Sequence, residues 1–140
     1  MSQIIDYEFQ IEWGDCDPAG IVFYPTYFRW FDIGTHRMMS AAGVGQRVQT
    51  EKFGIVGAVL VSAKCDFRQP VTFGDRLSHR VCVVEWSERS FVVSHVLSKA
   101  GEVAAQGAET RVCLAREANG VVRSIVIPEG FRQALVQISL

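Results

Sequence analysis

The chain has 140 residues, 49% of them hydrophobic and 21% charged, and its 14 Lys and Arg against 15 Asp and Glu give a formal net charge of -1. A chain of this length buries roughly two thirds of its unfolded surface, so a single domain over residues 1–140 can fold without disulfides. The balanced charge excludes a general field that attracts nucleic acid, and no segment approaches the ~20 apolar residues of a membrane span. We therefore expect no nucleic acid and no membrane among its partners.

The four cysteines are scattered along the chain, at Cys16, Cys65, Cys82 and Cys113. They form no Cys-x-x-Cys pair, and no histidine stands at the spacing of a zinc finger. Cysteines scattered in this way are typically reduced thiols. The first residues, MSQIIDYEFQ, carry acidic side chains where a secretory signal needs a basic start and an apolar run. These features predict a cytoplasmic protein.

The first two predicted elements are a strand and a long helix. Residues 6–13, DYEFQIEW, alternate apolar and polar side chains, which indicates a half-buried strand. A helix is predicted to start at Pro25, since proline suits a first helical turn, and to end at Gly43. Apolar residues recur between them at spacings of three and four in a wide stripe, so we expect other elements to wrap this helix.

The rest of the chain is predicted to be mostly extended. Residues 43–54, GVGQRVQTEKFG, form a looser stretch. Strands are predicted at residues 55–67, 76–86, 90–98, 103–116 and 121–127, with turns between them. Asn119-Gly120, between β-branched runs, is the strongest hairpin signal, and residues 129–135, EGFRQAL, predict a short terminal helix.

This order of elements predicts an α+β fold. One long apolar helix follows the first strand of an otherwise antiparallel meander, so we expect a sheet of about five to six strands wrapped around one central helix. Such a sheet leaves its edge strands open. We therefore expect at least a dimer that continues the sheet.

The loop before the predicted helix, GDCDPAGIVFYP, contains two carboxylates and a thiol. Asp15, Asp17 and Gly20 occupy positions one, three and six of an EF-hand-like calcium loop. Alanine and threonine stand at positions five and twelve, where two further ligands are required, so no metal is predicted. Ordinary turn chemistry, in which aspartate side chains bond their own backbone, is one explanation of the motif.

An acyl-transfer site is the other explanation of this loop. The loop leads directly into the N-terminus of an apolar helix, where unpaired N–H groups and the helix dipole favour developing negative charge. A carboxylate and a helix N-terminus facing one carbonyl would provide attack from one side and oxyanion stabilisation from the other. Because no histidine or serine motif accompanies the loop, the electrophile is expected to be an activated ester such as a thioester.

The remaining reactive side chains have structural interpretations. Cys16 has no recognisable base nearby in the sequence and is interpreted as a small buried thiol. His79 and His95 lie in predicted strands and are interpreted as ordinary strand residues. His36 follows Asp32 by four residues on the helix, where the two can form a salt bridge.

The segment EWGDCDPAGIVFYPTYFRWFD resembles the signature of the 4-hydroxybenzoyl-CoA thioesterase family of hot-dog-fold proteins, in the branch with an aspartate and no histidine in the loop. GIVG at residues 54–57, EWSERSF at 85–91 and RSIVIP at 123–128 resemble the same family in the same order. The resemblance covers nearly the whole chain. It implies a hot-dog fold, a homotetramer built from dimers, and hydrolysis of an aromatic acyl-CoA such as 4-hydroxybenzoyl-CoA to the free acid and coenzyme A. Coenzyme A is part of the substrate, and no cofactor is implied.

The resemblance also implies roles for residues around the thioester. Asp17 corresponds to the catalytic carboxylate, which attacks the thioester carbonyl or activates water, and the backbone N–H of Tyr24 corresponds to the donor that polarises this carbonyl. Asp32 matches the carboxylate that accepts a hydrogen bond from the ring hydroxyl of a hydroxybenzoyl group. A salt bridge from Asp32 to Arg29 or His36 is the structural alternative.

Three further positions match the family's coenzyme A site. Arg89, Ser90 and Arg123 correspond to cationic or polar positions that hold phosphates, and solvated turn arginines are the alternative. Ala58 lies in the implied substrate pocket, where the family has a threonine. The chain also departs from the family at Ser87 and Glu88, which replace basic residues, at Phe28, which replaces a histidine, and before residue 54, where a pocket tryptophan is lacking.

These departures leave three other functions open. One is a thioesterase for short aliphatic acyl-CoA, and another is a non-catalytic hot-dog module that binds an acyl thioester or has a structural role. A related dehydratase, with a catalytic histidine or glutamate on the central helix, is the third. The intact aspartate loop favours an acyl-CoA thioesterase over a binding module, because a binding module needs no carboxylate aimed at the carbonyl.

Overall fold

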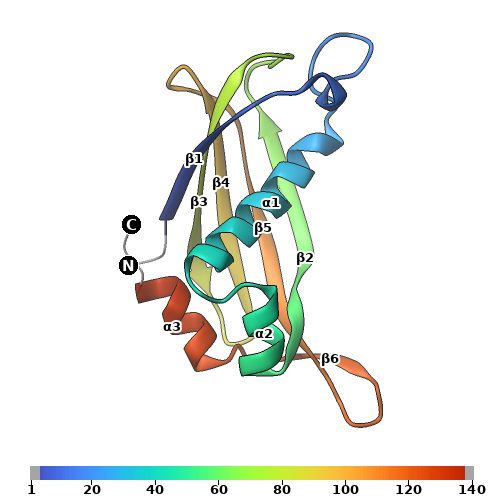
Figure 1. The fold of residues 1–140 in the computed structure, drawn as a ribbon, viewed down its shortest axis with the longest axis vertical. Helices are drawn as coiled ribbons and strands as arrows, with labels where there is room; N and C mark the ends of the chain where they lie inside the picture. Colours follow the sequence, from blue (N-terminus) through green and yellow to red (C-terminus); the bar gives the residue numbers. More distant parts are fainter. Residues whose placement is uncertain (1–3, 138–140) are drawn as a thin grey trace.

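The computed structural model describes residues 4–137, which form six strands, three α-helices and one short 3-10 helix (Figure 1). In chain order these are β1 (Ile4–Gln10), the 3-10 helix (Trp13–Asp15), α1 (Pro25–Ala41), α2 (Gln46–Phe53), β2 (Ile55–Phe67), β3 (Arg76–Trp86), β4 (Ser90–Lys99), β5 (Glu102–Arg116), β6 (Val122–Ile125) and α3 (Glu129–Gln137). Within these residues, none of the helices has both the length and the apolar character needed to cross a bilayer.

The sheet is antiparallel, with the order β1-β3-β4-β5-β2, and β6 pairs only with β5. From β3 to β6 each strand pairs with the next one along the chain, but β2 pairs with neither β1 nor β3, so the prediction of an otherwise continuous meander was wrong. The segment after α1 crosses to the far side of β5, where it pairs as β2. The sheet curls around α1, as Figure 1 shows, and the predicted α+β class with a wrapped central helix is confirmed.

Helix α1 has the boundaries that its sequence predicts. Pro25 is its first residue, and the chain leaves the helix through Gly43, whose φ of +79° suits glycine. Its buried face contains Tyr27, Trp30, Phe31, Gly34, Thr35, Met38 and Met39. At Gly34 the helix lies so close to the sheet that a Cβ atom would collide with the His79 ring, which explains the glycine.

Two segments differ most from the predictions. The first strand ends at Gln10, because Ile11 donates its N–H to the carbonyl of Asp75 outside the ladder, and Trp13 is 73% exposed in the 3-10 helix. Residues 46–53, expected to be loose, form α2. Their polar sequence lacks an apolar stripe, and the buried Gln49 fastens the helix by donating to the Val44 carbonyl at 2.9 Å.

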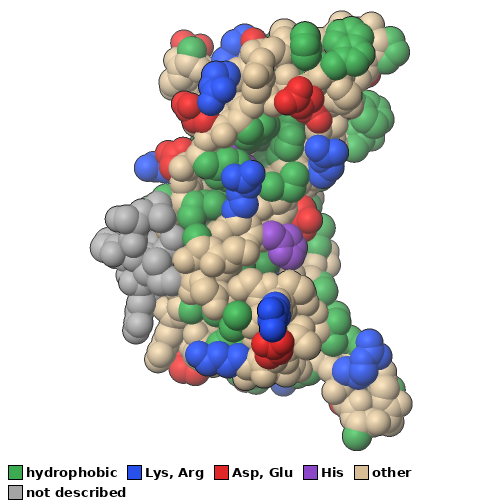
Figure 2. Space-filling model, in the orientation of Figure 1, with side chains coloured by type: hydrophobic (Ala, Val, Ile, Leu, Met, Phe, Trp, Pro, Cys, Tyr) green, Lys and Arg blue, Asp and Glu red, His purple; other side chains and the backbone are tan. Residues whose placement is uncertain are grey.

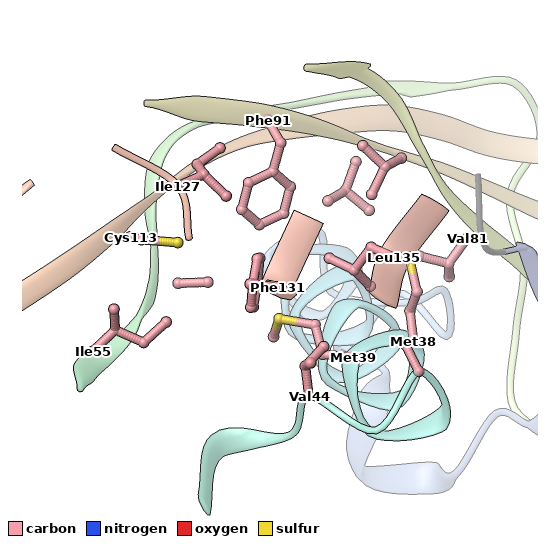
Figure 3. Packing of buried hydrophobic residues seen from close by; sticks show 14 of the residues in the cluster. Met38, Met39, Val44, Ile55, Val81, Phe91, Cys113, Ile127, Phe131 and Leu135 are labelled. Atoms are coloured by element: carbon pink, nitrogen blue, oxygen red, sulfur yellow. The ribbon is translucent and has the colours of Figure 1, made fainter. Parts of the chain in front are cut away.

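The apolar core consists of two clusters. The α3 cluster includes Met38, Met39, Phe91, Phe131 and Leu135, and Figure 3 shows these side chains packed between the helices and the sheet. The loop cluster includes Ile11, Val22, Tyr27, Trp30, Phe31, Leu77 and Leu97, around the N-terminal half of α1. Polar side chains lie between the two clusters on the inner face of the sheet.

The face drawn in Figure 2 carries basic and acidic side chains interspersed, in keeping with the balanced net charge. Exposed aromatic side chains gather where the chain passes from β1 to α1. Trp13 packs edge-on against Phe73, and Phe23 against Tyr24, with ring centroids 5.6 and 5.8 Å apart.

Candidate active site

Asp15, the first carboxylate of the loop, has a structural role. It is only 7% exposed, and its Oδ2 accepts the backbone N–H of Glu12 at 2.9 Å. Its backbone carbonyl accepts the N–H of Phe23, also at 2.9 Å. Arg29 lies 3.8 Å from the Asp15 carboxylate, so this arginine pairs here and not with Asp32.

Asp17, the second carboxylate, is half-buried and differently placed. Its Oδ1 accepts the backbone N–H of Ala19 at 2.8 Å, which is the turn contact expected of an aspartate before proline. Within residues 4–137, Oδ2 has no hydrogen-bond partner. The turn explanation therefore accounts for one oxygen of Asp17 and leaves the other available for chemistry.

The loop that carries Asp17 is fastened to the chain between β2 and β3. Val22 donates its N–H to the Val71 carbonyl at 3.0 Å, and the Thr72 hydroxyl donates to the Gly20 carbonyl. Gly20 has a φ of +83°, which closes the turn after Asp17. These hydrogen bonds fix the main chain of the loop that carries the Asp17 carboxylate.

Within residues 4–137, the N-terminus of α1 offers one backbone N–H without an acceptor. Tyr24 is the N-cap residue, and Pro25, which follows it, has no N–H. The N–H of Thr26 donates to the Phe23 carbonyl at 2.9 Å, and that of Tyr27 to the Tyr24 carbonyl at 3.2 Å. Among the residues that the structure describes, the N–H of Tyr24 has no acceptor, so it is available to a ligand.

The structure brings Asp32 and Ala58 together through Arg111. Arg111 donates from Nη2 to Asp32 Oδ1 and from Nη1 to the Ala58 carbonyl, both at 2.9 Å. His36 Nε2 lies 3.5 Å from the same Asp32 oxygen, which confirms the salt-bridge geometry expected for this pair. Sequence reasoning did not single out Arg111.

Arg111 continues into a chain of buried side chains across the sheet. Glu109 Oε2 accepts from Arg111 at 2.8 Å, and Glu109 Oε1 lies 2.9 Å from His95 Nε2. His95 Nδ1 lies 2.9 Å from His79 Nε2, and the Tyr7 hydroxyl lies 2.7 Å from His79 Nδ1. We call Arg111, Glu109, His95 and His79 the polar layer.

The polar layer separates the two apolar clusters. Along β3, His79 stands between Leu77 of the loop cluster and Val81 of the α3 cluster, and His95 has the corresponding place on β4. Both histidines are fully buried, so they are not ordinary strand residues. The sequence does contain a sign of this burial, because each histidine occupies an inward-facing position in the alternating pattern of its strand.

Burial and mutual contacts determine the charges of this layer. Burial raises the pKa of Glu109, but hydrogen bonds from His95 and Arg111 outweigh it and lower the pKa to about 2. Burial, assisted by the neighbouring His95, lowers the pKa of His79 to about 3, and burial likewise lowers the pKa of His95. At neutral pH the layer therefore contains two neutral histidines, one carboxylate and one guanidinium.

These charges give the hydrogen bonds one consistent direction. His95 donates from Nε2 to the Glu109 carboxylate, so its Nδ1 accepts from His79 Nε2. His79 Nδ1 then accepts the hydroxyl proton of Tyr7. The Glu109 carboxylate thus determines the tautomer of each histidine in turn.

Arg89 and Arg123 line one surface hollow of about 620 Å³ together with Glu117. Arg123 Nε lies 2.8 Å from Glu117 Oε1, and Arg89 Nη1 donates to the Ser124 carbonyl at 3.2 Å. Ser90 is the first residue of β4 and is half-buried. The structure thus brings the two predicted phosphate-binding arginines together.

The hollow and the Asp17 loop lie at opposite ends of the sheet. Figure 1 places β6, which carries Arg123, at the lower end and the loop before α1 at the upper end. The ten residues of β4 span roughly 33 Å between these ends. Within one chain, Asp17 and Arg123 are therefore not neighbours.

The thiols contribute no further site. All four cysteines are free, and Cys16 is half-buried with its Sγ 3.9 Å from the Glu12 carbonyl. Within residues 4–137, no group of three or more His, Cys, Asp or Glu side chains is placed to hold a metal ion.

Comparison with known proteins shows the family of this chain. Residues 11–135 match the thioesterase-like superfamily. The 4-hydroxybenzoyl-CoA thioesterase of Pseudomonas sp. (strain CBS-3) is 38% identical over 100 residues, 71% of each chain.

The solved structure of a mutant 4-hydroxybenzoyl-CoA thioesterase complexed with 4-hydroxybenzoyl-CoA has a TM-score of 0.88 at 30% identity, covering 96% of this chain and 99% of that one. A gentisyl-coenzyme A thioesterase has a TM-score of 0.79 at 34% identity, covering 94% and 98%. The chain therefore belongs to the thioesterase-like superfamily and has the hot-dog fold of the 4-hydroxybenzoyl-CoA thioesterases.

Proposed function

We propose that this acyl-CoA thioesterase hydrolyses an aromatic acyl-CoA, such as 4-hydroxybenzoyl-CoA, to the free acid and coenzyme A. Similar proteins named for 4-hydroxybenzoyl-CoA and gentisyl-coenzyme A support an aromatic acyl group. The observation that carries the proposal is the junction of loop and helix. There, among residues 4–137, one carboxylate oxygen of Asp17 and the N–H of Tyr24 have no hydrogen-bond partner and lie close in sequence.

In the proposed reaction, the free oxygen of Asp17 attacks the thioester carbonyl. Negative charge then develops on the carbonyl oxygen, where the N–H of Tyr24 and the N-terminus of α1 stabilise it. The carbon–sulfur bond breaks, coenzyme A leaves as thiolate, and water hydrolyses the resulting anhydride. In the alternative route, Asp17 takes a proton from the water that attacks the carbonyl directly.

Asp32 and Ala58 are proposed to hold the aromatic ring. The Asp32 side chain is 57% exposed, and Arg111 and His36 both face its Oδ1. Oδ2 has no partner among residues 4–137, so it is free to accept a ring hydroxyl. Ala58 borders the same arrangement, because its carbonyl accepts from Arg111.

Arg89, Ser90 and Arg123 are proposed to bind the phosphates of coenzyme A. Since these residues and Asp17 lie at opposite ends of one chain, we propose a homo-oligomer, a dimer or a tetramer, in which two copies complete one site. The outer edge of β2 supports an association between copies. This edge strand exposes half or more of the apolar side chains of Leu60 and Val61.

Thiol release from a panel of acyl-CoA esters tests this function. The panel contains 4-hydroxybenzoyl-, 3-hydroxybenzoyl-, benzoyl-, phenylacetyl-, acetyl- and hexanoyl-CoA. We expect the highest kcat/KM on the hydroxylated aryl esters. An aliphatic preference would contradict the proposed substrate while retaining the reaction, and no hydrolysis of any ester would favour a non-catalytic binding module.

A further inference from the structure

We infer that Arg111, held in place by Glu109, is the positioning residue of Asp32, and that this buried pair determines the preference for a hydroxylated ring. The inference rests on the proposed function, because it requires Asp32 in the acyl pocket. It adds a specificity role for two side chains that do not touch the reacting atoms.

Every nitrogen of the Arg111 guanidinium has a partner. Nη2 donates to Asp32 Oδ1 at 2.9 Å and to Glu109 Oε2 at 2.8 Å, and Nη1 donates to the Ala58 carbonyl at 2.9 Å. Nε lies 3.3 Å from Glu109 Oε1. Residues of α1, β2 and β5 therefore fix the planar guanidinium together, and Arg111 is only 3% exposed.

Glu109 is itself held from two other elements. The Thr35 hydroxyl of α1 donates to Oε1, and His95 of β4 donates to the same oxygen at 2.9 Å. Hydrogen bonds therefore prevent the carboxylate from rotating away from Arg111. Because the polar layer separates two apolar clusters, little space is left for Arg111 to adopt another rotamer.

Stability alone does not explain this arrangement. Desolvation of a buried ion pair offsets most of its Coulombic attraction, and well-packed apolar side chains at such positions are often as stable. In this protein the buried pair ends at a surface carboxylate, Asp32, and not at a further buried group. Positioning of the Asp32 carboxylate explains why the chain of buried charges leads to the surface.

Arg111 constrains a side chain that would otherwise be mobile. An exposed aspartate on a helix samples several rotamers, and ordering it after the substrate arrives would weaken the hydrogen bond to a ring hydroxyl. Arg111 from beneath and His36 from the next helical turn both face Oδ1. The free Oδ2 is thereby presented in one direction before the substrate binds.

The test is the ratio of kcat/KM for 4-hydroxybenzoyl-CoA to kcat/KM for benzoyl-CoA. This ratio is independent of the fraction of folded enzyme, because the same active molecules hydrolyse both esters. The variants are Asp32→Ala, Arg111→Lys, their combination, and Glu109→Gln. Arg80→Lys is the matched control, since Arg80 is exposed on β3 with Asp6 3.8 Å away.

We expect Asp32→Ala to lower the ratio about tenfold to a hundredfold, the effect of a lost hydrogen bond to a charged group. Arg111→Lys keeps the charge but loses the fork, and should lower the ratio about tenfold. The double variant should lower it no further than Asp32→Ala, because both changes remove one interaction. Arg80→Lys should leave the ratio unchanged.

The outcomes separate the two proposals. An unchanged ratio in Asp32→Ala would remove Asp32 from the proposed site and would overturn the inference with it. A low ratio in Asp32→Ala combined with a normal ratio in Arg111→Lys would overturn the inference alone, as would equal losses on both esters in Arg111→Lys. If Arg111→Lys does not fold, Glu109→Gln decides in its place: a reduced ratio supports the inference, and a normal ratio overturns it.

Discussion

Asp17 and Asp32 lie in two regions that hold a carboxylate in different ways. Asp17 is on a loop, and within residues 4–137 its carboxylate accepts one hydrogen bond, from the N–H of Ala19. Asp32 is on α1 above a buried ionic layer, with the Arg111 guanidinium directly beneath it. Asp17 is thus held by main-chain contacts of its own loop, whereas Asp32 depends on buried ionisable side chains that also affect folding and its dependence on pH.

The largest effect is expected from Asp17→Asn, which should lower kcat about 10²- to 10⁴-fold with little change in KM. Asparagine retains the acceptor for the Ala19 N–H, so Tm should stay close to that of the parent protein. Thiol release and a thermal melt measure the two quantities. Turnover close to normal would exclude Asp17 from the mechanism.

The matched control lies two residues earlier in the loop. Asp15→Ala removes the buried acceptor of the Glu12 N–H and should cost about 0.5–2 kcal/mol of stability, as the loss of a cap does. We expect a lower Tm together with measurable turnover. A stable but inactive Asp15→Ala variant would mean that the chemistry had been assigned to the wrong carboxylate.

A smaller effect is expected from pH, through the polar layer. The pKa of His79 is lowered from 6.5 to about 3, so below pH 6.5 the unfolded chain binds more protons than the folded one. Stability is therefore fully present above pH 6.5 and decreases as the pH falls towards 3, by about 1.4 kcal/mol per pH unit for one such group. Urea unfolding at pH 7, 6 and 5 measures this slope.

His79→Gln should reduce the slope, because one titrating group is lost, while His95 still contributes. Tyr7→Phe is the control, since it removes only the hydrogen bond to His79 Nδ1 at 2.7 Å and leaves both histidines in place. It should lower the stability at pH 7 and retain the slope. The same slope in His79→Gln as in the parent protein would contradict a protonation-resistant His79 in the core.

The smallest effect is expected at the far end of the sheet. Arg89→Ala and Arg123→Ala should each raise KM about two- to fivefold with kcat nearly unchanged, because exposed charges attract phosphate weakly and lie far from the thioester. Added salt should reduce the difference. Arg76→Ala, an exposed arginine paired with Glu8, is the control, and an equal rise in KM there would place coenzyme A elsewhere.

Several elements were predictable from local sequence. The strands at residues 55–67 and 76–86 have the predicted boundaries, because alternating side chains and the turns beside them are local signals. Pro25 and Gly43 mark the ends of α1 for the same reason. Helix α2 was missed, because its eight residues carry too few apolar side chains to show a period, and tertiary contacts such as that of Gln49 hold it.

Local sequence thus determined the α+β class, the central helix, and the loop that places Asp17 before the N-terminus of α1, since each depends on residues close in the chain. The tertiary structure decided the place of β2 beyond β5 and the assembly of the polar layer. Asp32 and Arg111 are 79 residues apart, and only the curling of the sheet around α1 brings them within hydrogen-bond distance. Strand order and helix packing are long-range properties, and no local pattern of side chains encodes them.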